Sequence, residues 1–325
     1  MLAGVMTAPH PTDTYQGQII HHGCPVLMLV YNGWDDVIAG LTAMQSNVQN
    51  LWLIDNGSTI DRIDEVRQSF PDVRIISTGA NLGWAGGYNH AISIADAEGL
   101  DTVYLLNSDA IPRAGAVDQA IKTLLSGPDI AAVGSMMLHH NGTRAFFDGD
   151  WHWDNKQATP SLREDVREVR TIHGGGFALN LSAYRDIGPF HEDYFLYHEE
   201  TDWCLRARAA GWQLLVDCKS RVDHEGEGSS TGFNRLYYIA RNRFLAKRRG
   251  IALRDRKESA MSIIEYEYLG SIGQSHSERI AITNGLIDGL RGRFGQRKTI
   301  YPAMVTAPLA ALLPSVFRLK RKLGL

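Results

Sequence analysis

The sequence has few cysteines, no long uninterrupted apolar run and no excess of basic charge. Three cysteines occur in 325 residues, and no two of them have the CxxC spacing of a metal-binding or redox pair. The odd number indicates reduced thiols in a cytosolic setting rather than a disulfide framework. The three are Cys24, Cys204 and Cys218.

The chain also lacks a targeting segment and a strong net charge. No basic region followed by an apolar stretch opens the sequence, so we expect no signal peptide and a cytoplasmic location. A formal net charge of -3 gives no general attraction to polyanions, and we expect no nucleic-acid partner. With 44% hydrophobic and 21% charged residues, the composition is typical of an ordinary globular protein.

Apolar runs alternate with helical segments across the first 110 residues. The runs end in polar or glycine residues, which indicates buried strands, and the segments between them are long enough for helices. This alternation is typical of βαβ units and predicts an α/β fold, with a mostly parallel central sheet and helices on both faces. Strands are predicted at 25–30, 51–54, 73–77 and 103–106, and helices at 34–47 and up to residue 97.

Two of these strands are followed by aspartate. Asp109 comes after the fourth strand, where open α/β sheets bind ligands, and a carboxylate there suits Mg²⁺ or Mn²⁺ carrying a phosphorylated substrate. A simple turn is the alternative. Asp55, after the second strand, is placed to accept hydrogen bonds from a ribose or base, although Asp also caps helices. Gly83, Gly86 and Gly87 permit close backbone approach before a helix whose N-terminus favours anions, without matching GxGxxG or the Walker pattern.

The sequence beyond residue 110 is less regular. A helix at 114–125 and a strand at 130–136 precede an irregular stretch to residue 170, which is typical of a binding loop or lid. Trp151 and Trp153 in this stretch can stack on sugar rings, but a tryptophan is more often core or interface, and we favour that interpretation. Further strands are predicted at 173–179 and 213–216.

Three carboxylates, from Glu199, Glu200 and Asp202, crowd the start of a helix that Gly211 ends. Acidic residues stabilise the positive end of a helix dipole, which explains one or two of them. Neighbouring carboxylates also raise one another's proton affinity, and such a group can take a proton from an acceptor hydroxyl. We favour the second interpretation, because a capping role does not require the aromatic residues before the helix. His224 is either a metal or phosphate ligand or an ordinary surface histidine.

Taken in order, six motifs resemble the inverting glycosyltransferases of family 2, which have the GT-A fold, and most closely their rhamnosyltransferase-like bacterial branch. The resemblance spans residues 26 to about 248. The motifs are Val30-Tyr31-Asn32-Gly33, Ile54-Asp55-Asn56-Gly57-Ser58, the stretch 81–89, Leu106-Asn107-Ser108-Asp109, the stretch 199–206 with His224, and the stretch 237–242.

The resemblance implies a role for each matching residue. It implies that Asp109 and His224 hold a divalent cation, Mg²⁺ or Mn²⁺, and that Glu200 is the catalytic base. The chain departs from the family at Asn107, where Asp is frequent, and at Glu200, where Asp is common. The nucleotide-sugar-binding residues that it implies are Tyr31, Asn32, Asp55, Asn81, Gly83, Trp84, Gly87, Asn107, Ser108 and Arg241.

The implied reaction is inverting transfer of a sugar, for which dTDP-rhamnose or a UDP-sugar is the expected donor. The expected acceptor is a hydroxyl of a bacterial cell-surface glycan or a lipid-linked saccharide, attacked in a metal-assisted single displacement. The alternative is a catalytically silent module that binds nucleotide sugar or glycan and does not need Glu200. Slow hydrolysis of donor without acceptor distinguishes the enzyme from the module.

The last 35 residues are basic and apolar. Residues 291–325 hold eight Lys or Arg and no acidic residue, whereas 302–317 are apolar but interrupted by Pro308 and Pro314 and too short to span a membrane. The segment fits contact with an anionic membrane surface, and equally a solvated tail or a homodimer contact. We predict an N-terminal lead-in (1–24), a nucleotide-sugar-binding half (25–110), an acceptor-binding and catalytic half (111–249) and a helical C-terminal extension (250–325).

Overall fold

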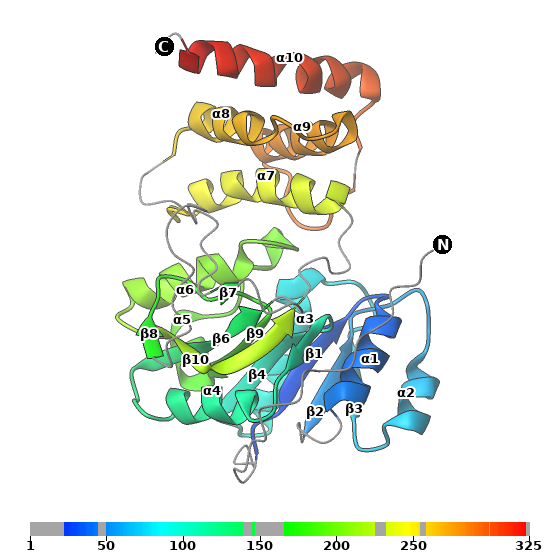
Figure 1. Cartoon of the computed structure of the whole chain (residues 1–325), viewed down its shortest axis with the longest axis vertical. Helices are drawn as coiled ribbons and strands as arrows, with labels where there is room; N and C mark the ends of the chain where they lie inside the picture. Colours follow the sequence, from blue (N-terminus) through cyan, green and yellow to red (C-terminus); the bar gives the residue numbers. More distant parts are fainter. Residues whose placement is uncertain are drawn as a thin grey trace.

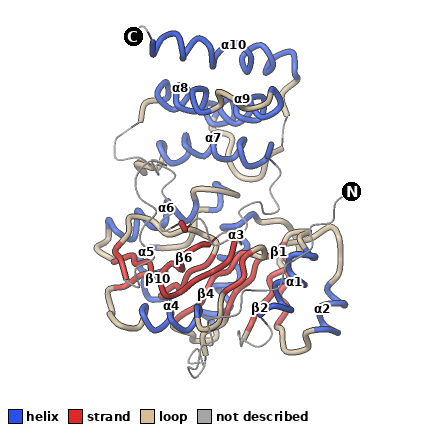
Figure 2. The backbone as a smooth tube through the Cα atoms, in the orientation of Figure 1, coloured by secondary structure: helices blue, strands red, loops and turns tan. Residues whose placement is uncertain are grey.

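The structure is a computed structural model that describes residues 23–44, 50–138, 145–146, 166–224, 232–253, 258–298 and 300–322. These residues form an α/β part built around one sheet, with a layer of four helices stacked beside it (Figures 1 and 2). Most of the predicted lead-in, Trp151, Trp153 and most of the predicted lid lie outside the described residues.

One sheet with strand order β3-β2-β1-β4-β9-β6-β10-β5 runs through the α/β part, with β7 paired to β6 and β8 to β10. Its strands are rich in apolar residues on both faces, as expected for strands that helices cover on both sides. Six strands run in one direction: β1 (Val26–Val30), β2 (Leu51–Asp55), β3 (Arg74–Ser77), β4 (Thr102–Asn107), β6 (Ile130–Leu138) and β10 (Gln213–His224). The opposite strands are β5 (Ala110–Pro112), β7 (Ala145–Phe146), β8 (Val166–Glu168) and β9 (Gly176–Asn180).

Helices cover both faces of the sheet, so the prediction of a mostly parallel sheet flanked by helices is confirmed. On one face α1 (Trp34–Met44), α2 (Ile63–Ser69) and α4 (Ala116–Leu124) share a core with alternate residues of β1, β4 and β6. On the other face α3 (Gly83–Ala97), α5 (Leu181–Ile187) and α6 (Glu199–Ala209) pack on the remaining residues of the same strands. The carboxyl ends of β1, β2 and β4 therefore meet at one edge.

The helical C-terminal extension is also confirmed. It contains α8 (Ala260–Gly270), α9 (His276–Arg291) and α10 (Ala303–Lys322). Helix α7 (Gly232–Arg248), predicted within the catalytic half, is stacked with these three; it lies nearest the α/β part and α10 farthest from it (Figure 1). Helices α7 and α9 cross closely, because a Cβ on Gly285 would lie 2.3 Å from the Tyr237 carbonyl oxygen. Thus α7 packs with the extension, and the predicted boundary after residue 249 stays a prediction.

Helix α10 contains Pro308 and Pro314. A proline has no N–H to donate to the carbonyl four residues earlier, so Pro314 leaves the Ala310 oxygen free of its usual helical partner. Arg279 Nε of α9 donates to that oxygen at 3.1 Å. None of the helices in the described part of the chain has both the length and the apolar character that a membrane crossing requires.

Three predicted elements differ from the structure. The strand predicted at 173–179 is β9, which begins only at Gly176, so residues 173–175 precede it. The glycines at 83, 86 and 87 were predicted to precede a helix, but they form the first turns of α3, where small residues let the helix approach the sheet. A strand predicted at 213–216 extends to His224, because β10 continues along β6 past a bulge between Asp217 and Arg221.

Candidate active site

The loops after β1 and β2 are joined by side-chain hydrogen bonds. Asn32 has a left-handed backbone, φ +59°, and its Oδ1 accepts hydrogen bonds from the N–H groups of Thr59 at 2.8 Å and Ile60 at 3.1 Å. Tyr31 beside it is exposed. The structure thus brings Asn32, one of the predicted nucleotide-binding residues, to the loop that follows β2.

Asp55 is buried at the end of β2, and its Oδ1 accepts a hydrogen bond from the Ser58 N–H at 3.0 Å. Its Oδ2 lies 3.4 Å from Ser77 Oγ, which donates to it. Helix α2 begins at Ile63, with Arg62 at its N-cap, so the alternative of Asp55 as a helix cap is wrong. The carboxylate instead holds the turn that shapes this edge of the site.

Helix α3 begins at Gly83 in contact with two other loops. Asn81 Oδ1 accepts from the Gly83 N–H at 3.0 Å, and Gly83 has φ +73°. A Cβ on Gly83 would lie 2.2 Å from the Phe195 carbonyl oxygen, and one on Gly87 would lie 2.5 Å from the Leu29 side chain. Both glycines therefore permit a close approach, as predicted, and the approaching groups are Phe195 and Leu29 of the protein.

Trp84 and Asn107 are joined across the sheet edge. Trp84 Nε1 donates to Asn107 Oδ1 at 3.1 Å, which fixes the orientation of a half-buried indole at the end of β4. Ser108 follows and lies near the loop after β1, since a Cβ on Gly33 would be 3.9 Å from its Oγ. Asn107 thus serves as an acceptor for the indole N–H, a role that an aspartate could also fill.

Asp109 and His224 face each other at the ends of β4 and β10, with 3.3 Å between Asp109 Oδ1 and His224 Nε2. Burial acts to raise the pKa of Asp109, but the neighbouring His224, the residue's own N–H and His173 outweigh it and lower that pKa. His224 Nε2 is buried, and its 3.3 Å contact with Asp109 does not have hydrogen-bond geometry, so the described residues leave this nitrogen without a hydrogen bond. A carboxylate beside an imidazole with an unsatisfied nitrogen fits a divalent cation.

His173 is a third member of this region. It was predicted only as part of a strand. Its ring meets that of His224 edge-on, with 5.5 Å between centroids, and its Nδ1 accepts from the Gly175 N–H at 3.0 Å. Burial, with the nearby His224, lowers the pKa of His173 to about 4, so the ring is neutral at pH 7. No group of three or more His, Cys, Asp or Glu side chains in the described ranges is arranged to hold a metal by itself.

The two glutamates at the start of α6 have different surroundings. Glu200 is half-buried, and burial raises its pKa to about 7. Glu199 is buried, and burial and the charge of Glu200 raise its pKa well above the usual value. Its Oε2 has no hydrogen-bond partner among the residues that the structure describes.

Gly174 connects Glu200 to the rest of the site. A Cβ on Gly174 would lie 3.3 Å from Trp84 Cζ2 and 3.7 Å from Glu200 Cγ, so both side chains pack against this glycine. Because His173 is the preceding residue and contacts His224, one short segment lies between the two glutamates and the Asp109–His224 pair. The structure therefore brings the predicted base and the predicted metal ligands to one edge.

Asp202 has a structural role. It is fully buried, with Arg206 Nε donating to Oδ1 at 2.8 Å and Arg249 Nε donating to Oδ2 at 2.9 Å. Tyr194 OH also donates to Oδ2, at 3.2 Å. These partners attach the first turn of α6 to α7, so Asp202 is occupied by protein groups.

Arg241, which the family resemblance implies to bind the nucleotide sugar, points into the protein. Its side chain is fully buried on α7, and its guanidinium donates to the carbonyls of Asp193, Tyr194 and Gly295 and to Asn242 Oδ1. It also lies over the ring of Tyr238, 4.7 Å from the centroid. A sequence pattern does not show which way a motif arginine points, and the partners of Arg241 in the described residues are main-chain carbonyls and Asn242, while its predicted contact with the nucleotide sugar stays a prediction.

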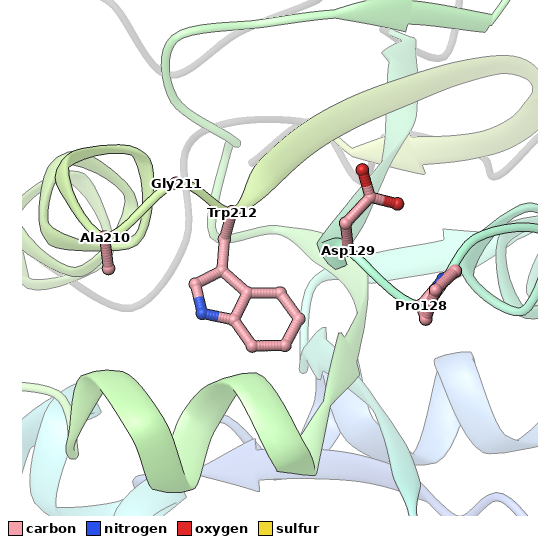
Figure 3. A pocket seen from close by; sticks show the side chains of 5 residues that line it. All are labelled: Pro128, Asp129, Ala210, Gly211 and Trp212. Atoms are coloured by element: carbon pink, nitrogen blue, oxygen red, sulfur yellow. The ribbon is translucent and has the colours of Figure 1, made fainter.

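A shallow hollow lies at the other end of the sheet, where β6 and β10 begin (Figure 3). It measures about 280 Å³ and is lined by Pro128, Asp129, Ala210, Gly211 and Trp212. Trp212 Nε1 donates to Asp186 Oδ2 at 2.8 Å, which holds the indole at the surface. The hollow is separate from the carboxyl edge, and none of the predicted site residues lines it.

Comparison with known proteins identifies the class to which this fold and site belong. The model of the family "Glycosyl transferase family 2" matches residues 26–188, half of the chain. The chain therefore belongs to this family and is a glycosyltransferase. The motif resemblance seen in the sequence is confirmed.

Individual relatives are more distant. The N-acetylglucosaminyl-diphospho-decaprenol L-rhamnosyltransferase of Mycobacterium tuberculosis is 26% identical, over 66% of this chain and 80% of the relative. The low-salt glycan biosynthesis hexosyltransferase Agl10 of Haloferax volcanii is also 26% identical, over 68% of this chain and 74% of the relative. The chain is thus similar to a rhamnosyltransferase over two thirds of its length.

Two solved structures share the fold. The mannosyltransferase PcManGT from Pyrobaculum calidifontis, in complex with GDP-Man and Mn²⁺, has a TM-score of 0.50 and 15% identity over 91% of this chain and 80% of its own. GalNAc-T7 with UDP, GalNAc and Mn²⁺ has a TM-score of 0.51 and 14% identity over 75% of this chain, which spans only 54% of the GalNAc-T7 chain. Both are glycosyltransferases of the GT-A type, so the predicted fold is confirmed.

Proposed function

We propose that this glycosyltransferase moves a sugar from a nucleoside diphosphate sugar to an acceptor hydroxyl by single displacement with inversion. The observation that carries the proposal is the segment 173–174, which contacts His224 on one side and Glu200 on the other. This segment supports the proposal because it places the proposed base and the proposed cation ligands close to each other. The tilted indole of Trp84, held by Asn107, offers a flat face beside this segment, where a sugar ring can stack.

Glu200 takes the proton from the acceptor hydroxyl in this proposal. The acceptor oxygen forms a bond to the anomeric carbon while the bond from that carbon to the diphosphate oxygen breaks, and the diphosphate leaves with the electron pair. Because burial raises the pKa of Glu200 to about 7, its carboxylate is a stronger base than an exposed glutamate and is still largely ionised in mildly alkaline solution. The pKa of the nearby Glu199 is also raised, by burial and by the charge of Glu200.

Asp109 and His224 are the residues that would hold a divalent cation, Mg²⁺ or Mn²⁺. Their 3.3 Å contact and the unsatisfied His224 Nε2 support this, as do the Mn²⁺ complexes of the two solved structures. Bound there, the cation would neutralise charge that develops on the leaving diphosphate. His173, neutral and packed against His224, orients that ring.

The donor and acceptor are proposed from the relatives. The name of the mycobacterial relative supports L-rhamnose as the sugar, from dTDP-rhamnose, and a lipid-linked glycan as the acceptor. A UDP-sugar is the second donor to test, since GalNAc-T7 is in complex with UDP. The donor can be identified by incubating the protein with each nucleotide sugar and detecting released nucleotide by mass spectrometry. A glycosyltransferase hydrolyses its own donor slowly even when no acceptor is present.

A lipid-linked acceptor requires the enzyme to work beside a membrane, and we propose that α10 provides this contact on the cytoplasmic face. Met304, Leu312 and Leu319 of α10 are 82%, 65% and 58% exposed, and Arg318 and Lys322 in its last turns are exposed too. Apolar and basic side chains on an outermost helix fit an anionic lipid surface. A homodimer through the same face is the competing outcome.

The deciding experiment replaces Glu200 by Gln, which keeps the shape of the side chain and removes the basic oxygen. At saturating donor we expect kcat to fall on the order of 10²-fold or more, with donor affinity and unfolding midpoint nearly unchanged. Glu199→Gln is the matched control and should cost less. If Glu199→Gln loses turnover while Glu200→Gln keeps it, the base is Glu199 and the assignment to Glu200 is wrong.

A further inference from the structure

The loop that leads into α6 has a backbone that its residues do not favour. Phe195, Tyr197 and His198 have φ values of +63°, +69° and +75°, although each carries a Cβ. Contacts between the Cβ and the backbone disfavour this left-handed region, so the loop needs strong interactions to keep it. Glu199 and Glu200 follow directly, and the conformation of this loop therefore decides where both carboxylates point.

Asn242 of α7 supplies such interactions to the loop. Its side chain is fully buried, and Nδ2 donates to the carbonyl oxygens of Tyr194 at 2.9 Å, Leu196 at 2.7 Å and Tyr197 at 2.8 Å. Three carbonyl oxygens of this irregular loop thus share one amide group. A loop held in this way cannot relax to ordinary φ values without losing all three bonds.

Arg241 orients the Asn242 amide. Its Nε and Nη2 donate to Asn242 Oδ1 at 2.9 Å and 2.7 Å. A guanidinium has only donors, so it requires the amide oxygen to face it and turns the NH₂ group toward the loop. Nη2 also donates to Tyr194 O at 2.7 Å and Asp193 O at 3.2 Å, so Arg241 holds the beginning of the same loop directly.

The opposite side of the loop contacts the donor side of the site. Phe195 O accepts a hydrogen bond from the Trp84 N–H at 2.8 Å, and the absence of a Cβ on Gly83 makes this approach possible. The loop is therefore fixed between α7 and the first turn of α3. Any movement of it would displace Glu200 and Trp84 relative to each other.

We propose that Arg241 and Asn242 are positioning residues that hold the loop 193–198 in its left-handed form and so present Glu200 to the acceptor hydroxyl. This inference rests on the proposed function and assigns the conspicuous arginine of the 237–242 motif to the loop, in place of the diphosphate. It also gives α7 a part in positioning the base, because this pair, called the Arg241–Asn242 clamp below, lies on α7.

The first test measures the loop without any assay of activity. Arg241→Lys keeps the charge but loses the planar fork that reaches several carbonyls at once, and Asn242→Asp keeps the shape but replaces the donating NH₂. Hydrogen exchange read by mass spectrometry should accelerate at least tenfold in peptides covering 193–202. Arg243→Lys is the matched control: Arg243 is buried on the same helix and pairs with Glu258, so its exchange change should stay within α7 and α8.

The second test measures the chemistry in the same variants. A displaced base should lower kcat by about 10²-fold while the donor dissociation constant changes less than threefold. Because a loosened loop admits water to Glu200, its raised pKa should fall, and the acid limb of the kcat profile should move to lower pH than in the wild type and in Arg243→Lys. A loss of stability alone does not move this limb.

Several outcomes overturn the proposal. Unchanged exchange at 193–202 in Arg241→Lys shows that the clamp does not hold the loop, and accelerated exchange with normal kcat shows that the loop does not position the base. A donor dissociation constant raised tenfold or more, with an unshifted pH limb, returns Arg241 to diphosphate binding. If Asn242→Asp fails to fold, Arg241→Lys decides alone; if Glu200→Gln is fully active while the exchange result holds, the proposed base is wrong and the clamp stands.

Discussion

The α/β part and the helical extension of this protein carry opposite charge. Residues 1–231 contain 30 acidic and 15 basic residues, a formal charge of -15, whereas residues 232–325 contain 6 acidic and 18 basic residues, a formal charge of +12. The overall charge of -3 is the small remainder of this asymmetry. The net charge of the whole chain therefore does not exclude attraction of an anionic partner to one part of it, because a surface attracts a partner through its local field.

The two parts also differ in what their exposed groups can do. The α/β part gathers polar side chains at one sheet edge, among them Asp109, His224 and Glu200. The extension has most of its exposed large apolar side chains on its outermost helix, α10. We therefore expect substitutions in the α/β part to alter the chemistry and substitutions on α10 to alter membrane docking. Each of the following variants tests this separation.

The largest effect is expected from Asp109→Ala, which removes the carboxylate of the proposed cation pair. Loss of several kcal/mol of charge stabilisation corresponds to a fall in kcat/KM of about 10³-fold. The wild type in EDTA should lose transfer similarly and recover it when Mn²⁺ or Mg²⁺ is restored, while liposome binding by α10 stays unchanged. Full turnover in chelator would remove the cation from the mechanism.

The next effect concerns the junction between the two parts. Asp202→Asn removes a fully buried carboxylate from Arg206 and Arg249, and we expect the free energy of unfolding to fall by about 3 kcal/mol in urea titrations. Asp64→Asn, which breaks an exposed pair with Arg67, should cost under about 0.5 kcal/mol. Equal costs would mean that the junction is no stronger than a surface contact.

A smaller effect is expected when the charge at the end of α10 is reversed. Arg318→Glu with Lys322→Glu should weaken binding to anionic vesicles by roughly 30-fold, from about 1 kcal/mol per basic residue, and added salt should narrow the difference. Turnover on a soluble acceptor should not change. The matched control, Arg67→Glu with Lys122→Glu, makes the same charge change in the α/β part and should leave vesicle binding intact. Concentration-dependent dimerisation that only the α10 variant loses would favour a homodimer contact instead.

The smallest effect separates activity from stability by pH. A base must be ionised, so kcat should fall about tenfold per pH unit below the Glu200 pKa of about 7. Stability should run the other way: because the folded protein raises the pKa of Glu200 above its unfolded value, the protonated form is favoured by folding. This contribution is complete below about pH 4.5 and is lost as pH rises through about 7. Glu200→Gln should flatten the kcat curve and reduce the pH dependence of stability, leaving the part due to the raised pKa of Glu199; an unchanged stability profile would place the titration elsewhere.

Much of the fold could be predicted because apolar runs mark buried strands whatever their partners. The runs at 26–30, 51–55 and 102–107 are buried by helices on both faces, and each gave its strand within about a residue. The direction of β9 could not be predicted in this way, since period and composition do not encode whether a strand runs parallel to its neighbour. The glycines at 83 and 87 were assigned to a loop, because only the packing of α3 on Leu29 shows why a helix needs them.

The site was predicted where residues lie at strand ends and missed where side-chain direction decides. Asp109 was predicted at a strand end, but its meeting with His224 depends on β5, which pairs antiparallel with β10 so that Ala110 lies opposite His224. His173 precedes three glycines and gave no signal of its own, and its part in the site depends on a contact between two rings. Arg241 belongs to a motif, but a motif does not tell which way a helical side chain points.

The proline at position 314 determines how the outermost helix is seated. It frees the Ala310 carbonyl, and Arg279 of α9 takes that oxygen. Sliding α10 by one turn would bring Arg279 opposite a carbonyl already bonded within its own helix, so only one alignment satisfies both groups. The proline thus sets the alignment of α10 along α9, and that alignment determines which side chains of α10 are exposed.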